Sequence, residues 1–166
     1  MVVIRAETPA DVAAIRAVHL DSFPSALEAR LVELLRDAGH LVVSLVAEID
    51  GVVVGHVGFS PVSTAKGSAG VGLAPIAVLP GQRRQGIAGD LVTHGLDACA
   101  ARGYGWAVVL GDENFYSRFS FVAAPQFGLF DEYGGGDAFQ IAELLDGSLP
   151  VCEGLVRYGA EFASLG

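Results

Sequence analysis

The segment 75–89 reads Pro-Ile-Ala-Val-Leu-Pro-Gly-Gln-Arg-Arg-Gln-Gly-Ile-Ala-Gly and contains the transition that decides the fold. Its start is typical of a buried strand, and the apolar positions after Gly86 recur at helical spacing. Small residues keep the first helical turn bare, where backbone N–H groups lack partners and the helix dipole adds positive charge. Together with the adjacent Arg83 and Arg84, this pattern predicts a phosphate or pyrophosphate cradle. An ordinary strand-to-helix loop with capping glycines and solvated arginines is the alternative.

Two common nucleotide-binding motifs do not describe this segment. The chain contains no G-x-x-x-x-G-K-[ST] sequence, which excludes a P-loop. Gly70-Val71-Gly72 forms G-x-G, but it precedes a strand instead of opening a helix, which argues against a dinucleotide-binding turn.

Outward from this segment, strands and helices alternate through one sequence. Strands are expected at 2–4, 41–49, 52–59, 71–78, 106–110, 121–124 and 138–145, helices from 8 to 23, 25 to 39 and 86 to 102, a short helix at 114–118, and a loop at 60–70. Asp50-Gly51 predicts a hairpin turn, because both residues tolerate positive φ. Pro75 cannot complete a regular ladder, so the strand 71–78 should carry a bulge or a splayed edge. The pattern predicts an α/β fold with a largely covered central sheet.

Composition limits the classes of partner. The chain has 166 residues, of which 52% are hydrophobic and 17% charged, so a single folded domain spanning 1–166 is expected. Its net charge of −9 opposes binding to nucleic acid or to an anionic membrane surface. We expect a cytoplasmic protein, because no apolar run reaches membrane-spanning length, no signal peptide is evident, and Cys99 and Cys152 are typical of two reduced thiols. The apolar excess is compatible with a homodimer.

The segment Val78-x-Pro80 followed by Arg83-Arg84-Gln85-Gly86-Ile87-Ala88 resembles the acetyl-CoA motif of the GNAT N-acetyltransferase superfamily, [QR]-x-x-G-x-[GA]. The resemblance implies a GNAT-like fold: a central mixed, twisted sheet of about six to seven strands, flanked by helices and splayed at the bulged strand 71–78. It implies that the pantetheine arm lies in this gap and that the pyrophosphate lies on the loop and the helix N-terminus. The cofactor-binding residues carried over in this way are Ile76, Ala77, Val78, Arg83, Arg84, Gln85, Gly86, Ile87, Ala88 and Gly89.

A second match lies downstream, at Phe115-Tyr116-Ser117-Arg118-Phe119-Ser120-Phe121, which resembles the family segment L-Y-x-[KR]-x-G-F. The resemblance implies that Tyr116 is the general acid that protonates the departing CoA thiolate. A phenol suits that task because its ordinary pKa near 10 keeps it protonated at neutral pH. Ser120 departs from the family pattern by replacing a glycine. Similarity to the YhbS-like branch of the superfamily, including Val156-Arg157-Tyr158, extends along essentially the whole chain.

The resemblance implies direct attack of an amine, from a small molecule or a protein, on acetyl-CoA in a ternary complex, without a metal. A CoA-binding regulatory module without turnover is the alternative. His56 is a candidate base because its ordinary pKa suits proton transfer, although a histidine in an apolar strand is more often a core residue. Asp21 and Glu28 are candidates for binding a cationic acceptor, and Tyr133 for its wall, although exposed surface positions are the simpler interpretation of all three.

Overall fold

The structure, a computed structural model, describes residues 1–164, so the last two residues of the expected domain 1–166 lie outside it. Within the described residues, nine strands join one mixed sheet. The strands are β1 Val2–Ala6, β2 Val43–Ile49, β3 Val52–Thr64, β4 Ala69–Val78, β5 Trp106–Leu110, β6 Val122–Ala123, β7 Leu129–Asp131, β8 Phe139–Glu143 and β9 Gly154–Arg157. The helices are α1 Val12–Ser22, α2 Leu27–Asp37, α3 Ile87–Ala101 and α4 Glu113–Tyr116, with short 3-10 turns between elements.

The sheet runs β1-β2-β3-β4-β5-β8-β6, and β9 pairs with both β3 and β7. Most neighbours are antiparallel, whereas β4–β5 and β7–β9 are parallel. The α/β fold class is confirmed, and the sheet includes two short strands, β7 and β9, beyond those expected. No helix within residues 1–164 is both long enough and apolar enough to cross a membrane.

The β2–β3 hairpin follows from its turn residues. Asp50 and Gly51 both have positive φ, 50° and 81°, as expected for this dipeptide. The expected loop at 60–70 is wrong, because β3 continues to Thr64 and β4 begins at Ala69. Pro61 is tolerated there because pairing with β2 ends at Phe59 and leaves an open strand edge.

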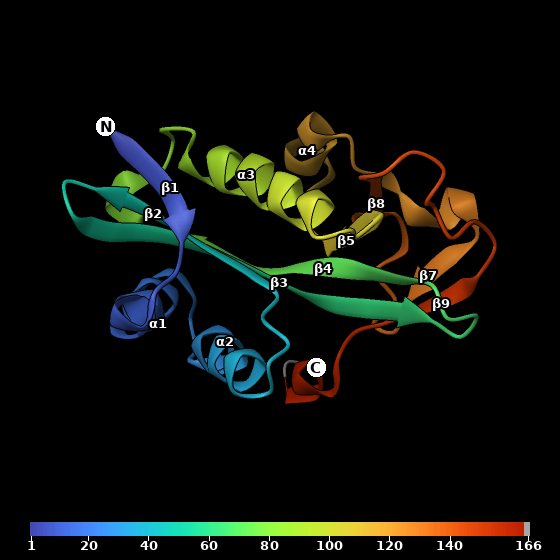
Figure 1. Cartoon of the computed structure of the whole chain (residues 1–166), viewed down its shortest axis with the longest axis horizontal. Helices are drawn as coiled ribbons and strands as arrows, with labels where there is room; N and C mark the ends of the chain where they lie inside the picture. The colour runs from blue at the N-terminus through green and yellow to red at the C-terminus, as the bar shows by residue number, and fades with distance from the viewer. Residues whose placement is uncertain (165–166) are drawn as a thin grey trace.

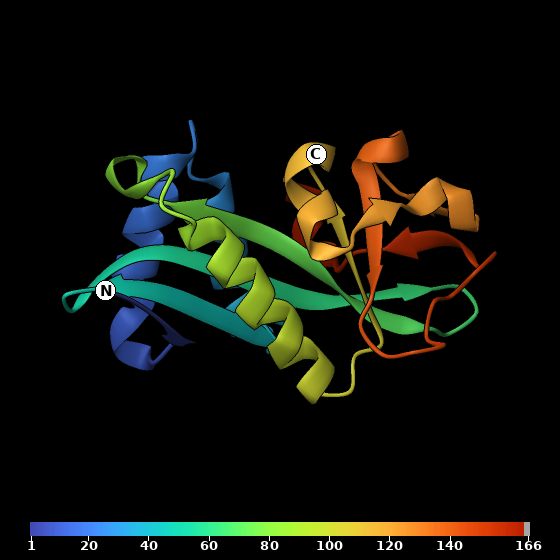
Figure 2. The same cartoon turned by 90° about the horizontal axis from the view of Figure 1, so that it is seen from above.

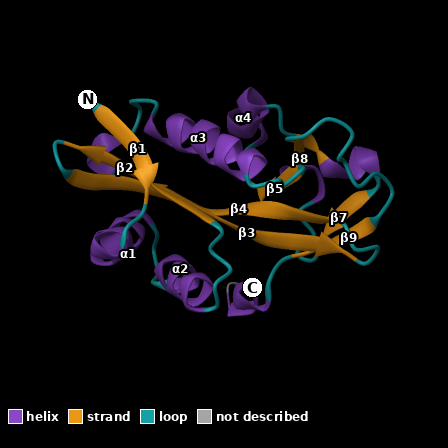
Figure 3. Ribbon diagram, viewed as in Figure 1, coloured by secondary structure: helices purple, strands orange, loops and turns teal. Residues whose placement is uncertain are grey.

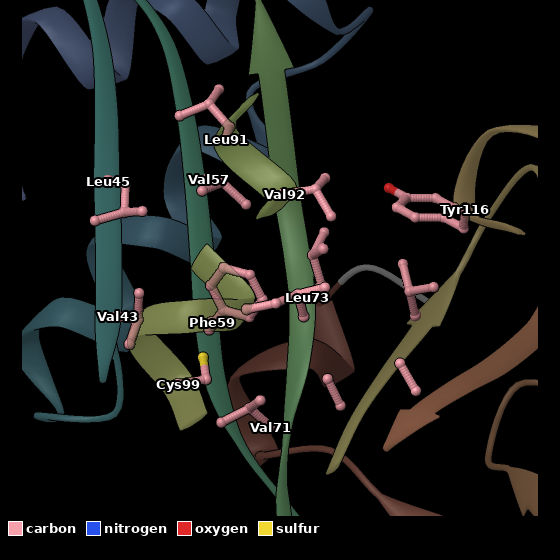
Figure 4. Packing of buried hydrophobic residues seen from close by; sticks show 14 of the residues in the cluster. Val43, Leu45, Val57, Phe59, Val71, Leu73, Leu91, Val92, Cys99 and Tyr116 are labelled. Atoms are coloured by element: carbon pink, nitrogen blue, oxygen red, sulfur yellow. The ribbon is translucent and has the colours of Figure 1, made fainter. Parts of the chain in front are cut away.

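Helices cover both faces of the sheet. Figure 1 shows α1 and α2 on one face and α3 and α4 on the other, and Figure 2 shows α3 lying across the strands. Figure 3 shows that the C-terminal turn lies on the same face as α2, where Phe162 packs with Leu31 and Leu35. Side chains of α3 pack onto β2, β3 and β4 in the largest core cluster (Figure 4). Two-sided burial explains why the central strands are apolar at nearly every position.

The sheet parts between β4 and β5. These strands pair only at Val71↔Ala107 and Gly72↔Val108, after which they diverge. On the other edge of β4, the register with β3 shifts between Val57 and Phe59, so that Ala74 and Pro75 lie opposite a single residue. The Ala74–Pro75 peptide is cis. The bulge and the splay expected from Pro75 are therefore both present, and they create the gap in which the candidate site lies.

Candidate active site

A cleft of about 530 Å³ opens where β4 leaves β5 and the chain enters α3. Its floor is the end of β4, Ile76 to Val78, and its rim is the loop and first turn of α3. Gly86 caps α3 with a φ of +79°, and a Cβ added there would meet nothing within 4 Å. The helix N-terminus is therefore open to a ligand, with first-turn N–H groups available to an anion.

The cleft is cationic despite the acidic chain. Among the described residues that line it, Arg83, Arg84 and Arg118 are charged and none is acidic. Arg83 Nε donates to the Val78 carbonyl at 3.1 Å, which holds the loop against the strand end. The Arg118 guanidinium lies 4.8 Å from the centre of the Phe115 ring, so a cation–π contact keeps it at the rim. Arginines and bare amides together suit a pyrophosphate.

Tyr116 lies beside the gap at the end of α4. Its side chain is buried, packed edge-on against Phe115 at 4.9 Å and Phe121 at 5.6 Å. Figure 4 shows its hydroxyl oxygen directed toward β4. Gly111 makes room for the ring, because a Cβ there would lie 2.6 Å from Tyr116 Cε2. Burial, reinforced by the nearby Asp112 carboxylate, raises the pKa of Tyr116 to about 12, so the phenol holds its proton at neutral pH.

Ser120, which replaces the glycine of the second motif, keeps a glycine-like backbone conformation. Ser120 adopts a φ of +69°, in the left-handed region that glycine enters without a steric penalty. The short turn after α4 therefore keeps the backbone shape that a glycine would favour.

A second, smaller cavity of about 280 Å³ adjoins the cleft. The two cavities share Phe23 and Ile76 in their walls, and Tyr116 lines the smaller one. Its other lining residues are Glu28, Leu31, Leu73, Ala74, Pro75 and Leu110. A cationic cleft and a largely apolar cavity with one carboxylate thus meet at β4.

The sequence-predicted site residues do not all gather here. Nine of the ten predicted cofactor residues line the cleft, whereas Gln85 is exposed and donates to Gln82 at 3.2 Å. Asp21 is exposed and Tyr133 is 45% exposed, and neither lines the cleft or the smaller cavity. Of the three acceptor candidates, only Glu28 lines either cavity.

Other cleft residues were not singled out from the sequence. They are Ser22, Phe23, Gln82, Phe115 and Arg118. Arg118 occupies the [KR] position of the second motif, so that motif held a signal for it. Phe23 immediately precedes the helix-breaking Pro24, and nothing local to it indicates that α1 ends over the gap.

His56 lies away from both cavities, in a buried polar chain on the α1 face of the sheet. Its Nδ1 lies 2.8 Å from His19 Nε2 and its Nε2 lies 2.8 Å from Ser44 Oγ. Ser44 donates to Glu7, which pairs with Arg36 at 2.9 Å. Because the Ser44 proton is committed to Glu7, His56 donates to Ser44 and accepts from His19, which makes the His56 ring neutral. The His19 Nδ1 atom is buried without a hydrogen-bond partner among the described residues, so a proton there would be unpaired and the neutral ring is favoured.

This chain supports a wall of the site. The His19 ring stacks on Phe23 with centroids 5.9 Å apart and planes 7° from parallel. Phe23 is shared by the two cavities, so the buried histidines hold a residue that both cavities need. His56 lines neither cavity, and its ring is fully enclosed. Its position therefore supports a structural role instead of direct contact with an acceptor.

The buried histidines make stability depend on pH. Burial lowers the pKa of His19 from 6.5 to about 4. Burial, followed by the proximity of the His19 ring and the Arg36 guanidinium, lowers the pKa of His56 well below 6.5. The folded state keeps both rings neutral, whereas the unfolded chain binds protons below about pH 6.5. Stability should therefore fall as pH decreases from 6.5 toward 4, and His19 alone should account for about 2 kcal/mol at pH 5.

Denaturant unfolding at pH 7 and pH 5 measures this loss. The double variant His19→Gln/His56→Gln should lose less stability over that interval, because amides do not titrate there. His94→Gln, which removes an exposed histidine, should behave like the wild type. An equal loss in the double variant and the wild type would contradict the assignment.

Neither cysteine lies in either cavity. Burial raises the pKa of the Cys99 thiol to about 12, and Cys152 is exposed. No group of three or more His, Cys, Asp or Glu side chains within residues 1–164 is arranged to hold a metal ion.

The chain belongs to the acetyltransferase (GNAT) family, whose sequence profile matches residues 12–121. The uncharacterized N-acetyltransferase YhbS of Escherichia coli K12 is 43% identical over 162 residues, which are 96% of this chain and 97% of the relative. Both the superfamily and the branch suggested by the motifs are thereby confirmed.

Two solved structures extend the comparison. The crystal structure of E. coli YhbS in complex with CoA matches with a TM-score of 0.94 at 42% identity, covering 99% of this chain and 93% of that one. A GNAT family acetyltransferase from Brucella melitensis in complex with acetyl-CoA matches with a TM-score of 0.83 at 36% identity, covering 98% of each chain.

Proposed function

We propose that this protein is an N-acetyltransferase that moves the acetyl group of acetyl-CoA to a primary amine. One observation carries the proposal: the arginine-rimmed, glycine-capped N-terminus of α3 opens directly onto the gap beside Tyr116. The complexes of relatives with CoA and acetyl-CoA support it. The net reaction converts an ammonium and acetyl-CoA into an amide, free CoA thiol and one proton.

The two ends of the cleft divide the task of binding. Arg83, Arg84, Arg118 and the first-turn amides of α3 would hold the pyrophosphate. The end of β4, Ile76 to Val78, would receive the pantetheine arm, because this stretch has no pairing with β5 in the described structure. Backbone N–H groups near Val78 would polarise the thioester carbonyl, a type of contact that stabilises developing negative charge.

Tyr116 would supply the proton to the leaving thiolate. The amine nitrogen forms a bond to the carbonyl carbon, the C–S bond breaks, and the phenol protonates the sulfur. A pKa raised to about 12 suits a group that must be protonated when the substrate binds. The bound ammonium must first lose one proton to give the neutral amine that attacks, and the nitrogen loses a second proton as the amide forms. The phenolate regains one proton, so one proton is released overall.

Calorimetry with acetyl-CoA tests the cleft. Arg83→Ala should weaken binding by about 10-fold, because one charge-assisted contact to phosphate is lost at an exposed site. Arg157→Ala removes the same charge at an exposed position on β9, outside the cleft, and should leave the affinity unchanged. No acetyl-CoA binding to the wild type would refute the proposal.

Release of free thiol across a panel of primary amines tests turnover. An acetyltransferase should release CoA thiol in proportion to the amide formed. Binding of acetyl-CoA without thiol release by any amine would instead identify a regulatory module.

A further inference from the structure

In the described part of the chain, the smaller cavity is lined by one charged group, a carboxylate with an oxygen that lacks a hydrogen-bond partner. Glu28, in the first turn of α2, is the only charged residue among the described residues that line it. Its Oε1 atom is inaccessible to solvent and has no hydrogen-bond partner within residues 1–164. A buried carboxylate oxygen without a partner costs free energy, so its presence beside a cavity calls for an explanation, and a bound cationic group is one that the cavity can accommodate.

The other lining residues and the volume of the cavity limit which molecule could bind beside Glu28. The cavity walls are aliphatic apart from Glu28 and the aromatic rings of Phe23 and Tyr116. A volume of about 280 Å³ is at or below the lower end of the range for small-molecule sites, so the occupant is compact. An ammonium group would form a charge-assisted hydrogen bond with the Glu28 carboxylate, and an apolar or aromatic body would fill the remaining space.

The position of the cavity relates it to the reaction. Phe23 and Ile76 separate it from the cleft proposed for acetyl-CoA, and Tyr116 forms part of its wall. A molecule held there lies beside the point at which the two cavities meet. The charges of the cavities are also opposite, with arginines on the cleft and a carboxylate here.

We infer that Glu28 is the specificity residue for the acetyl acceptor, and that the acceptor is a compact primary amine bound as its ammonium form, with an apolar body and no carboxylate next to the amine. This inference rests on the proposed acetyltransferase function and adds the substrate class. A neighbouring carboxylate on the acceptor would be repelled by Glu28 in a site with few other polar groups.

Binding of 2-phenylethylamine, measured by calorimetry with CoA present, tests the inference without requiring turnover. The wild type should bind 2-phenylethylamine, and phenylalanine, its counterpart with a carboxylate, should bind at least about 10-fold more weakly. Glu28→Gln should weaken 2-phenylethylamine binding by about 10- to 100-fold and reduce the discrimination against phenylalanine. Asp21→Asn, which removes an exposed carboxylate outside both cavities, should leave both affinities unchanged.

Thermal unfolding distinguishes a binding role from a structural one. Glu28→Gln should leave Tm equal or higher, because the carboxylate oxygen has no partner to lose. A lower Tm together with unchanged amine affinity would overturn the inference. So would wild-type binding of a lysine-containing peptide but not of 2-phenylethylamine, because the acceptor would then be a protein.

Thiol release distinguishes failure of the proposed acetyltransferase function from failure of the inference about Glu28. If only the proposed function fails, amine binding would still depend on Glu28, but no amine would release thiol from acetyl-CoA. Where thiol is released, the KM for 2-phenylethylamine should rise by about 10- to 100-fold in Glu28→Gln while acetyl-CoA affinity stays the same.

Discussion

Replacing Tyr116 with Phe is expected to lower kcat by about 100-fold or more, while acetyl-CoA affinity is unchanged. The variant keeps the buried ring packed against Phe115 and Phe121 and removes only the hydroxyl directed toward β4. In the proposed mechanism, the variant has no phenol to protonate the departing thiolate, which raises the barrier of the chemical step. Steady-state thiol release and calorimetry measure the two quantities separately.

The pH dependence of turnover and the control variant Tyr104→Phe test the same role of Tyr116. The proposed mechanism requires the protonated phenol, whose pKa is raised to about 12, so wild-type turnover should persist as pH rises through 10. Tyr104→Phe removes a phenol outside both cavities and should keep full activity. If kcat is retained in Tyr116→Phe, another group donates the proton.

Substitution of Gly70 by Ala is expected to lower the free energy of unfolding by about 3 kcal/mol. An added Cβ would press on the Trp106 ring and lie 2.6 Å from the Trp106 carbonyl oxygen. Neither can move freely, because Trp106 is 2% exposed and belongs to β5. Overpacking here would force apart β4 and β5 beside their only two paired positions.

Thermal unfolding should show this as a fall in Tm of about 6–12 °C for a chain of this size. Gly81→Ala is the control, because a Cβ there meets nothing within 4 Å. Equal Tm values for the two variants would show that β4 and β5 adjust to the added methyl group. Crowding also explains the second glycine of the G-x-G, because a Cβ at Gly72 would lie 2.7 Å from Tyr158 Cε2. Both glycines therefore allow close packing around β4.

Local signals in the sequence predicted the elements that local chemistry determines. Asp50-Gly51 specified its turn, the small residues after Arg84 specified the open start of α3, and Pro75 indicated the irregular strand. In each case a backbone preference of the residue itself decides the conformation.

The features that the sequence did not predict depend on distant partners. β7 and β9 are short strands that exist because they pair with each other, and β9 also pairs with β3. The bond between His19 and His56 joins residues 37 positions apart. The cavity around Glu28 is lined by residues of α2, β4 and β5, which are far apart in the sequence. The residue spacing within a single segment does not predict that these elements come together.

The meeting of two cavities at Phe23 and Ile76 also bears on the order of events. If acetyl-CoA occupies the cleft and the amine the smaller cavity, as proposed above, the two sites do not coincide and both substrates can be bound together. The proposed reaction then passes the acetyl group directly from CoA to the amine, without an acetylated protein intermediate. The enclosed thiol of Cys99, whose pKa is raised to about 12, is in keeping with such a direct transfer.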